Sequence, residues 1–498
     1  MAKPITRNKP VYKTAGLYFV VALTIVTALF IYQAYDLNVI PSKYLMIACG
    51  VLLVFFAGLT YLQLGKHVNK INRILGKILI VILTIILGGG NWYLYHTGSA
   101  FRRMTGANKD LSVVSVVVHK DSPYYAISDL KDKEVGVISV GDKALLEETV
   151  AKMKVDMKAD FHSKEYTSYK SYADDLLNGK VDAILLNESS RGLIEDHFSE
   201  FNRKTRIITQ YTYEKEAKDI SKGVDVLTKP FNVYITGIDT YGELVTVSRT
   251  DVNMIVSVNP NTHQILMLGI PRDYYVPQTC QNDQLDKLTH TGIFGVDCTI
   301  ETMEHLMGID INYYARVNFS SLINIVDALG GVEVESPFPF RSKFGYEYVE
   351  GINHLNGKEA LGFARERKSL ADGDSERSRN QMRLLQGIIN KAISPAIITN
   401  YKDVLDAVSG SFQTNMSMDE MTAFVKAQLN SMKGWDIKQI QLTGTGATKF
   451  TPANGFDAYV MIPNEVSITD SRALIEKLHR DELITEEDIA HHLEITAE

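Results

Sequence analysis

The chain has 498 residues, of which 45% are hydrophobic and 22% are charged, and this is enough for two or three domains with their own cores. Its formal net charge of -7 gives no broad basic field for nucleic acid, and we find neither a helix-turn-helix nor a zinc-finger spacing. Composition therefore argues against direct nucleic-acid binding.

Three apolar stretches are the clearest signal in the sequence. Each is almost free of charge and about long enough to cross a hydrocarbon core of ~30 Å. They cover residues 14–33, 44–63 and 77–95, and a buried core helix is disfavoured at such a length. We therefore predict that residues 1–105 form a membrane anchor with three transmembrane helices.

Basic residues in the short loops predict the orientation of this anchor. Four precede the first stretch and four lie between the second and the third, namely Lys3, Arg7, Lys9, Lys13, Lys66, Lys70, Arg73 and Lys77. The positive-inside rule places the N-terminus in the cytoplasm and the chain after about residue 101 outside. We expect a multi-pass protein of the cell membrane without a cleavable signal peptide, because two further spans follow the first.

The chain has three cysteines. Cys49 lies within the second apolar stretch, where it can pack as a small apolar residue. Cys280 and Cys298 flank a loop in the outside part, and they could form a disulfide or remain as two free thiols. No neighbouring Cys or His pair supports a zinc site.

Residues 106–226 are predicted to form an extracellular accessory domain, reached through a polar linker at 98–110. Strand and helix patterns alternate there, which indicates an α/β unit. Short stretches at 127–137 and 177–186 resemble extracellular solute-binding domains. The domain could instead be a spacer or a protein-contact module, and a polar linker at 211–229 would close it.

Residues 227–470 are predicted to form a second extracellular α/β domain, followed by an acidic C-terminal tail at 471–498 with helical period. Asp239 and Arg272 come directly after predicted strands, and Arg249 and Asp251 come directly before one. Ligands of open α/β sheets sit beyond the carboxyl ends of strands, and two carboxylates can supply oxygen ligands for Mg²⁺. Each Asp alone is more often a turn residue or a cap.

A run of charged residues at 361–386 is the other candidate site. Residues 363–367 alternate like a strand, which would put Arg365 and Arg367 on one side of the chain.

The turn Asp372-Gly373-Asp374 would follow this strand as an acidic N-cap and open a helix with Arg377 and Gln381 on one face. Guanidinium forks that converge in this way suit a pyrophosphate, because each fork can hold two oxygens. The alternative is a solvated helix start with ordinary surface arginines. The segment at 443–446 (TGTG) is interpreted as a turn.

Six blocks in this order resemble the characteristic blocks of the LytR-CpsA-Psr family. They are 233–242 (VYITGIDTYG), 248–251 (SRTD), 269–273 (GIPRD), 286–295 (DKLTHTGIFG), 313–333 and 357–381. The three spans and the accessory domain resemble the CpsA type found in streptococcal capsule clusters.

The resemblance implies an α/β catalytic domain with a central mixed sheet, and an extracellular transferase. Such enzymes move a glycopolymer from a polyprenyl-pyrophosphate carrier onto peptidoglycan through a phosphodiester link and release the polyprenyl phosphate. Capsular polysaccharide is the polymer that the resemblance favours, with other capsule-assembly membrane proteins as further partners.

The resemblance also implies roles for individual residues. Asp239 and Asp251 match aspartates that hold Mg²⁺, with Mn²⁺ as the alternative ion. The pyrophosphate would be bound by Arg249, Arg272, Lys287, Arg365, Arg367, Arg377 and Gln381. The catalytic set would be Arg272, Arg249 and Asp374, with Asp374 as the candidate that accepts the proton of the attacking hydroxyl. Thr291 and Asn380 depart from residues common in the family.

Three alternatives remain open at this stage. A non-catalytic regulator of capsule synthesis would bind the pyrophosphate without cleaving it, and a polyprenyl-pyrophosphate phosphatase would use water as the acceptor. The accessory domain could also serve as a scaffold for capsule-assembly proteins.

Overall fold

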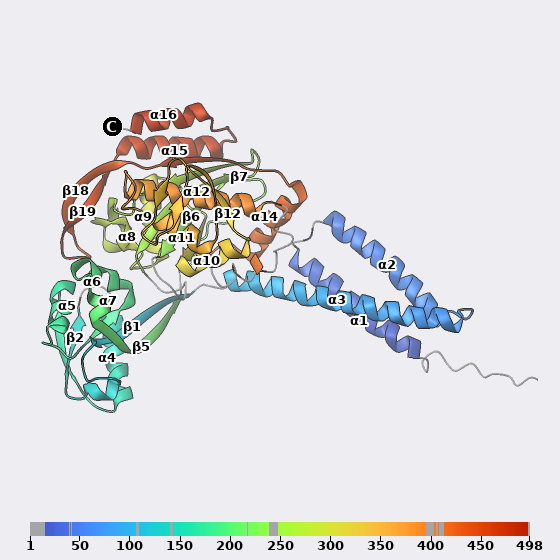
Figure 1. The fold of residues 1–498 in the computed structure, drawn as a ribbon, viewed down its shortest axis with the longest axis horizontal. Helices are drawn as coiled ribbons and strands as arrows, with labels where there is room; N and C mark the ends of the chain where they lie inside the picture. The colour runs from blue at the N-terminus through green and yellow to red at the C-terminus, as the bar shows by residue number, and fades with distance from the viewer. Residues whose placement is uncertain are drawn as a thin grey trace, which may run out of the picture. The chain divides into compact units, whose positions relative to one another are not determined.

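The computed structural model of the chain is shown in Figure 1. It describes residues 15–38, 40, 42–105, 109–139, 143–216, 218–238, 248–394, 403–404, 407 and 413–496. The chain divides into two compact units, and the first consists of Met1–Arg103, Tyr401–Ser409 and Ser417–Lys433. The remainder of the chain forms the second unit.

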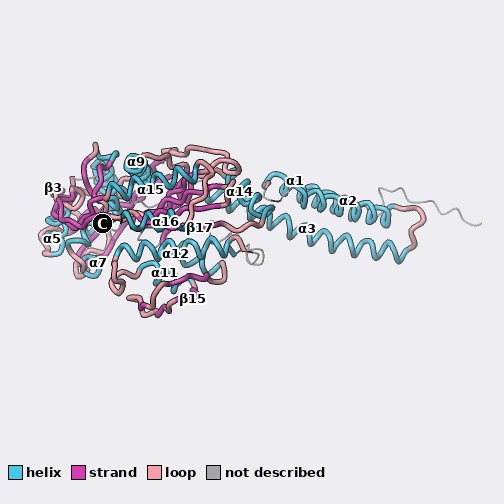
Figure 2. Tube along the Cα trace, turned by 90° about the horizontal axis from the view of Figure 1, so that it is seen from above, coloured by secondary structure: helices cyan, strands magenta, loops and turns pink. Residues whose placement is uncertain are grey.

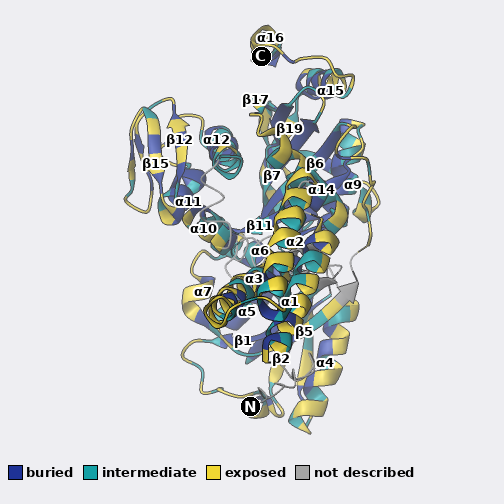
Figure 3. Cartoon of the chain, turned by 90° about the vertical axis from the view of Figure 1, so that its right-hand side faces the viewer, coloured by how far each residue is buried: buried dark blue, intermediate teal, exposed yellow. Residues whose placement is uncertain are grey.

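The first unit contains three long apolar helices, α1 (Ala15–Leu37), α2 (Ser42–Leu64) and α3 (Lys70–Thr105). All three are long and apolar enough to cross a membrane, which confirms the predicted spans. Much of their surface is exposed or only partly covered by protein, as expected for helices that contact lipid (Figure 3). The unit also holds the amphipathic helix α14 (Met418–Ser431).

The prediction of a polar linker at 98–110 is wrong for residues 98–105, because α3 continues to Thr105. No proline interrupts the segment, and a single glycine lowers helix propensity without ending a long helix.

The accessory domain is an α/β fold within the second unit. Its sheet has the order β3-β2-β4-β1-β5, in which β2 runs parallel to β3 and β4 while β1 is antiparallel to β4 and β5. The strands are β1 (Lys109–His119), β2 (Glu134–Ile138), β3 (His162–Tyr166), β4 (Ala183–Asn187) and β5 (Thr205–Glu216). The helices are η2 (Ile127–Leu130), α4 (Lys143–Met157), α5 (Tyr169–Leu177), η3 (Glu188–Ser190), α6 (Arg191–His197) and α7 (Phe201–Lys204).

The linker predicted at 211–229 is wrong for its first part, because β5 continues to Glu216 and pairs with β1. Its polar residues alternate with Tyr211 and Tyr213, which pack on the domain core, so the segment is a half-buried strand. Alternation, and not polarity, was the informative pattern here.

The second domain is built on the mixed sheet β16-β11-β6-β7-β8-β17, which confirms the predicted α/β fold class. Its strands are β6 (Phe231–Ile238), β7 (Thr250–Asn259), β8 (Gln264–Gly269), β11 (Tyr313–Asn318), β16 (Gln413–Thr414) and β17 (Asp436–Gln441). β6 and β8 are both antiparallel to β7. The ends of β6 and β8 and the start of β7 therefore share one edge of the sheet.

Helices cover both faces of this sheet (Figures 2 and 3). On one side lies α12 (Asp374–Ala392), which contacts β8 and β17. On the other lie α9 (Val296–Met307) and α15 (Glu465–His479), and α16 (Glu486–Thr496) packs on α15. A disulfide between Cys280 and Cys298 joins η4 (Thr279–Gln281) to α9, which resolves the alternatives left open for this pair.

The smaller elements follow the chain. They are β9 (Tyr275–Gln278), β10 (Gln284–Lys287), α8 (Leu288–Thr291), α10 (Phe319–Ala328), β12 (Val332–Ser336), β13 (Phe340–Arg341), β14 (Glu347–Tyr348), β15 (Gly351–Leu355), α11 (Gly357–Arg365), β18 (Gly444–Thr451) and β19 (Phe456–Pro463).

Two expectations for the C-terminal part differ from the structure. The predicted turn at 443–446 is wrong, because Gly444 begins β18, where its missing side chain leaves room for the carbonyl of Ile462 on β19. The division placed at residue 470 falls inside α15, whose Leu474 and Leu478 are buried in the core of the second domain. A helix whose apolar face is buried in this way is part of the domain and not an appended tail.

Candidate active site

Three segments meet at the shared edge of the main sheet. Arg249 and Asp251 stand at the start of β7, and Arg272 lies in the turn after β8. Lys287 ends β10, directly before the short helix α8. Because β7 and β8 are antiparallel, the start of β7 lies beside the end of β8. Residues far apart in sequence therefore converge here.

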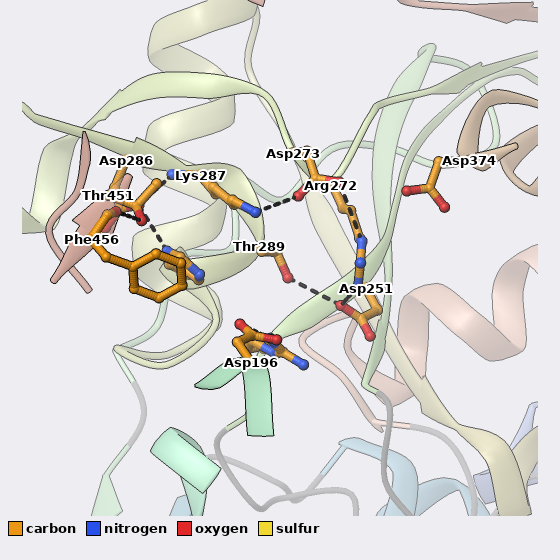
Figure 4. Close-up of polar contacts among 12 residues, drawn as sticks. Asp196, Asp251, Arg272, Asp273, Asp286, Lys287, Thr289, Asp374, Thr451 and Phe456 are labelled. Atoms are coloured by element: carbon orange, nitrogen blue, oxygen red, sulfur yellow. Dashed lines mark hydrogen bonds and ion pairs between the residues drawn. The ribbon is translucent and has the colours of Figure 1, made fainter. Parts of the chain in front are cut away.

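The cations at this edge are paired with carboxylates (Figure 4). Arg272 donates from Nη1 to Oδ1 of Asp251 over 2.9 Å, and Thr289 donates to the same oxygen over 3.1 Å. The Lys287 ammonium lies 3.1 Å from Oδ1 of Asp273, and the Nε of Arg272 lies 3.6 Å from Oδ2 of that residue. Asp273 and Asp251 thus hold Arg272 from two sides.

The pair of Asp251 and Arg272 is held in its charged form. Burial on its own would raise the pKa of Asp251, but the charges of Arg272, Arg249 and Arg377 outweigh it and lower that pKa to about 2. Burial disfavours the charged form of Arg272, yet Asp251 and the other carboxylates around it raise its pKa. The site is therefore a dense, fixed array of alternating charges at neutral pH.

The charged run after α11 lies close to this array. Oδ1 of Asp374 is 3.3 Å from Nη2 of Arg377 and 3.5 Å from Nη1 of Arg367. Asp374 also contributes to the raised pKa of Arg272. Burial lowers the pKa of Arg377, and the nearby cations Arg272 and Arg367 act in the same direction. Of the residues predicted to converge, the structure brings Arg367, Arg377 and Asp374 together.

The local structure of this run differs from the prediction in two respects. Residues 363–365 are the end of helix α11 and not a strand, because Asn356 and Glu359 form a capping box that starts a helix. The N-cap of α12 is Gly373, without a side-chain cap, and Asp374 is the first residue of the helix. A carboxylate at that position is favoured by the helix dipole.

Arg365 and Gln381 have other contacts. The guanidinium of Arg365 lies over the ring of Phe319 at 3.9 Å and near that of Phe344 at 5.6 Å. Gln381 donates to the carbonyl of Ala364 over 3.3 Å, which ties α12 to the end of α11. In this structure Arg365 stacks on aromatic rings, and its predicted contact with pyrophosphate stays a prediction.

A cavity of about 330 Å³ opens at the paired charges. Its lining comprises Asp196, Arg249, Arg272, Asp273, Lys287, Thr289, His290, Asn454, Phe456, Asp457, Ala458 and Tyr459. Three cations in one small concave space suit an anion such as a diphosphate, with Phe456 and Tyr459 supplying apolar surface beside them.

Of the two predicted metal ligands, Asp251 belongs to the site and Asp239 lies outside the described residues. Within the described residues, the hydrogen bonds that Asp251 accepts from Arg272 and Thr289 both fall on Oδ1, which leaves Oδ2 as the candidate ligand to a cation. Across the described part of the chain, no three His, Cys, Asp or Glu side chains are grouped to hold a metal ion. A Mg²⁺ that takes one or two carboxylates and the phosphates of its substrate needs no such group, so the chemistry of Asp251 fits this ion.

Comparison with known proteins assigns the family. The profile of the LytR_cpsA_psr family matches residues 197–472, more than half of the chain. The chain belongs to the LytR-CpsA-Psr family. A profile described as DNA polymerase processivity factor matches residues 70–186, a range that runs through α3 and covers too little of the chain to assign membership.

Curated relatives of this LytR-CpsA-Psr protein carry the name polyisoprenyl-teichoic acid–peptidoglycan teichoic acid transferase TagU. The chain is 35% identical to the one from Enterococcus faecalis over 47% of this chain and 77% of the relative. It is also 35% identical to the one from Bacillus subtilis, over 53% of this chain and 84% of that relative.

Solved structures also match about half of the chain. The crystal structure of B. subtilis TagU is 31% identical, with 52% of this chain and 100% of that chain covered and a TM-score of 0.41. The structure of TagT bound to LIIa-WTA is 26% identical, with 52% and 94% covered and a TM-score of 0.42.

Sequence reasoning missed several residues of the cavity. Asp273 and His290 stand inside blocks that carried the family resemblance, so their position there was an available signal. Phe456 and Tyr459 come from β19, where no pattern marked them. Asp196 belongs to the accessory domain, and nothing in the sequence linked it to this site.

Proposed function

We propose that this LytR-CpsA-Psr protein is a membrane-anchored extracellular phosphotransferase that joins a polyprenyl-pyrophosphate-linked glycopolymer to peptidoglycan. One observation carries the proposal. Arg249, Arg272 and Lys287 line a single cavity, and each is held by a carboxylate. The names of the relatives, which are transferases of a polyisoprenyl-linked polymer to peptidoglycan, support the same reaction class.

The reaction is the transfer of a substituted phosphoryl group. A hydroxyl oxygen of peptidoglycan attacks the phosphorus that carries the glycopolymer, and a new phosphorus–oxygen bond forms. The bond from that phosphorus to the bridging oxygen breaks, so that polyprenyl phosphate leaves with the electron pair. The hydroxyl proton passes to a base. Phosphoryl transfer of this kind depends mainly on positioning and on charge stabilisation.

The paired cations supply both requirements. Arg272 is fixed by Asp251 and Asp273, so its remaining donors are already oriented toward an incoming phosphate. Asp273 also pairs with Lys287, whose ammonium group supplies a compact positive charge at the other side of the cavity. Arg367 and Arg377 add two more guanidinia, both within ion-pair distance of Asp374, that could stabilise negative charge on the phosphates.

Asp374 is the proposed base. Its Oδ1 is buried and accepts no hydrogen bond within the described structure, although two guanidinia lie within ion-pair distance. From this position its carboxylate could take a proton from a hydroxyl that approaches the phosphorus.

We include Mg²⁺ in the proposal, with Mn²⁺ as the alternative ion. Asp251 would hold it together with Asp239, which lies outside the described residues. When bound, such an ion neutralises charge on the phosphates and helps to fix their orientation.

We further propose that the polymer is a capsular polysaccharide and that the protein is of the CpsA type, with contacts to other capsule-assembly membrane proteins. The order of three membrane helices, accessory domain and catalytic domain supports this choice. The N-terminus would be cytoplasmic and the catalytic domain extracellular, where the carrier lipid presents its pyrophosphate at the outer leaflet.

The test uses the full-length protein in detergent micelles, as wild type and as Arg272→Ala. Each is incubated with a polyprenyl-pyrophosphate-linked oligosaccharide, a peptidoglycan oligomer and Mg²⁺, and mass spectrometry follows the joined product and the polyprenyl phosphate. Joined product that requires Arg272 supports the transferase. Polyprenyl phosphate without joined product would identify a phosphatase, and binding without either product would identify a sensor.

A further inference from the structure

The accessory domain reaches into the cavity through helix α6. Nη1 of Arg249 donates to Oδ2 of Asp196, the sixth residue of that helix, over 2.9 Å. Arg249 belongs to the catalytic domain and contributes to the low pKa of Asp251, so it is part of the charged array described above. Asp196, a residue of the accessory domain, thus forms an ion pair with Arg249, a residue of the charged array in the catalytic domain.

Two glycines, one from each domain, fix the position of Arg249. A Cβ at Gly192 of α6 would lie 2.6 Å from Nε and 2.7 Å from Cζ of Arg249, so the guanidinium rests on the bare backbone of that helix. A Cβ at Gly292 would lie 2.7 Å from the backbone nitrogen of Thr250, directly after Arg249. Gly192 therefore packs against the side chain of Arg249, and Gly292 packs against the backbone beside it.

A second contact places α6 in the wall of the cavity. The ring of His197 lies 4.4 Å from that of Phe456, and its Nε2 is 3.3 Å from the carbonyl oxygen of Asn454. Phe456 and Asn454 both line the cavity. The end of α6 therefore contacts the wall of the site at a point separate from Arg249.

From this arrangement we propose that Asp196 of the accessory domain is a positioning residue for Arg249 and that the accessory domain completes the pyrophosphate site. The inference rests on the proposed function. An arginine whose side chain is already fixed loses less conformational entropy when it binds a phosphate, and its donors need no reorganisation. The family profile begins at residue 197, so Gly192 and Asp196 lie outside the part of the chain that it matches.

Three variants separate this role from others. Asp196→Ala removes the acceptor, whereas Asp196→Asn keeps an oxygen that can accept from Arg249. Gly192→Ala adds a methyl group against the guanidinium without changing charge, and alanine favours the helix. The control is Asp160→Asn, because Asp160 is a carboxylate of the same domain that is 82% exposed and pairs with Lys154.

The experiment measures binding of geranylgeranyl pyrophosphate with Mg²⁺ to the full-length protein by calorimetry. Wild type and Asp160→Asn should bind equally, and Asp196→Ala and Gly192→Ala should bind about five- to tenfold more weakly. Asp196→Asn should recover most of this loss, which a general effect of the variant on folding would not produce. Circular dichroism checks that every variant is folded.

The outcomes distinguish this inference from the proposed function. If wild type does not bind geranylgeranyl pyrophosphate, the proposed function falls and this inference falls with it. If wild type binds and Asp196→Ala binds equally well, the positioning role alone is refuted. Tighter binding by Asp196→Ala would also refute it, because the carboxylate would then be a competitor of the phosphate for Arg249.

Discussion

Arg272 and Asp251 are joined by an ion pair of 2.9 Å in which neither side chain is more than about a fifth exposed, at 21% and 14% respectively. The pair links the turn after β8 to the start of β7, which are separate segments of the chain. Since a buried charge that loses its partner is strongly destabilising, each residue depends on the other for its place in the site.

Arg272→Lys should abolish most transfer while the protein remains folded. Lysine keeps the charge, but a single ammonium cannot reproduce a planar fork that contacts Asp251 and Asp273 together. We expect kcat/KM for joined product to fall by roughly 100-fold or more, as for the loss of a fixed charge donor in other active sites.

The matched control is Arg341→Lys, because the side chain of Arg341 is 69% exposed and pairs only loosely with Glu347 at 3.9 Å. It should leave kcat/KM unchanged. Retention of more than about a third of the wild-type value by Arg272→Lys would show that the planar fork is not required.

The stability of the protein should depend on the ionisation of Asp251 at acid pH. Its pKa in the folded protein is about 2, below the value of about 3.9 expected for the unfolded chain. A lowered pKa stabilises the fold at pH values above about 4, and this contribution is lost as the pH falls toward 2. Thermal unfolding of wild type and Asp251→Asn between pH 7 and pH 2 measures it.

We expect Asp251→Asn to be less stable at pH 7 by on the order of 2 kcal/mol, since it leaves Arg272 without its charged partner. The difference in stability between the two proteins should be constant down to about pH 4 and should become smaller below that pH. If the difference in stability between the two proteins stayed the same down to pH 2, the ion pair with Arg272 would not be what stabilises the ionised form of Asp251.

The position of the site at the strand ends could be predicted from sequence, because strand ends in an open sheet meet at one edge. Asp251 and Arg272 were found in this way, and the structure joins them directly. The sequence also predicted that guanidinia from two neighbouring segments converge around a carboxylate, and the structure places Arg367 and Arg377 beside Asp374.

Other features depend on tertiary contacts that leave no local pattern. Residues 363–367 were predicted to alternate like a strand, yet the capping box of Asn356 and Glu359 starts a helix that ends at Arg365, whose guanidinium lies over the ring of Phe319. Asp196 looks like any polar residue of a short surface helix, and its partner Arg249 lies 53 residues further along the chain. Only the packing of one domain on the other reveals the pair.

The disulfide between Cys280 and Cys298 should matter for stability more than for chemistry. It closes a loop over a sequence separation of 18 and ties η4 to α9, whose Ile300 and Met303 lie in the core of the second domain. Cys280→Ser with Cys298→Ser should lower the free energy of unfolding by roughly 2–4 kcal/mol. Transfer at 25 °C should change little, because neither cysteine lines the cavity.

Chemical denaturation with and without a phosphine reductant measures this effect. Wild type with reductant should behave as the double variant does without it, and Cys49→Ala is the control, since Cys49 lies in α2 and forms no disulfide. Equal stability of the oxidised and reduced proteins would contradict the prediction.

Transfer should require a divalent cation that is held in part by Asp251. Chelation by EDTA should abolish the joined product, and Mg²⁺ should restore it, with Mn²⁺ as a substitute. The hydrogen bonds that Asp251 accepts from described residues fall on Oδ1, so we expect Oδ2 to be the ligand to the ion. Asp251→Asn should therefore raise the Mg²⁺ concentration needed for half-maximal transfer by about tenfold or more, since an amide oxygen lacks the full charge of a carboxylate. The matched control is Asp310→Asn, whose side chain is 76% exposed and whose partner Lys222 does not line the cavity. If Asp251→Asn lowered the maximal rate without changing the Mg²⁺ requirement, Asp251 would serve only to hold Arg272, and the ion would have to be bound elsewhere.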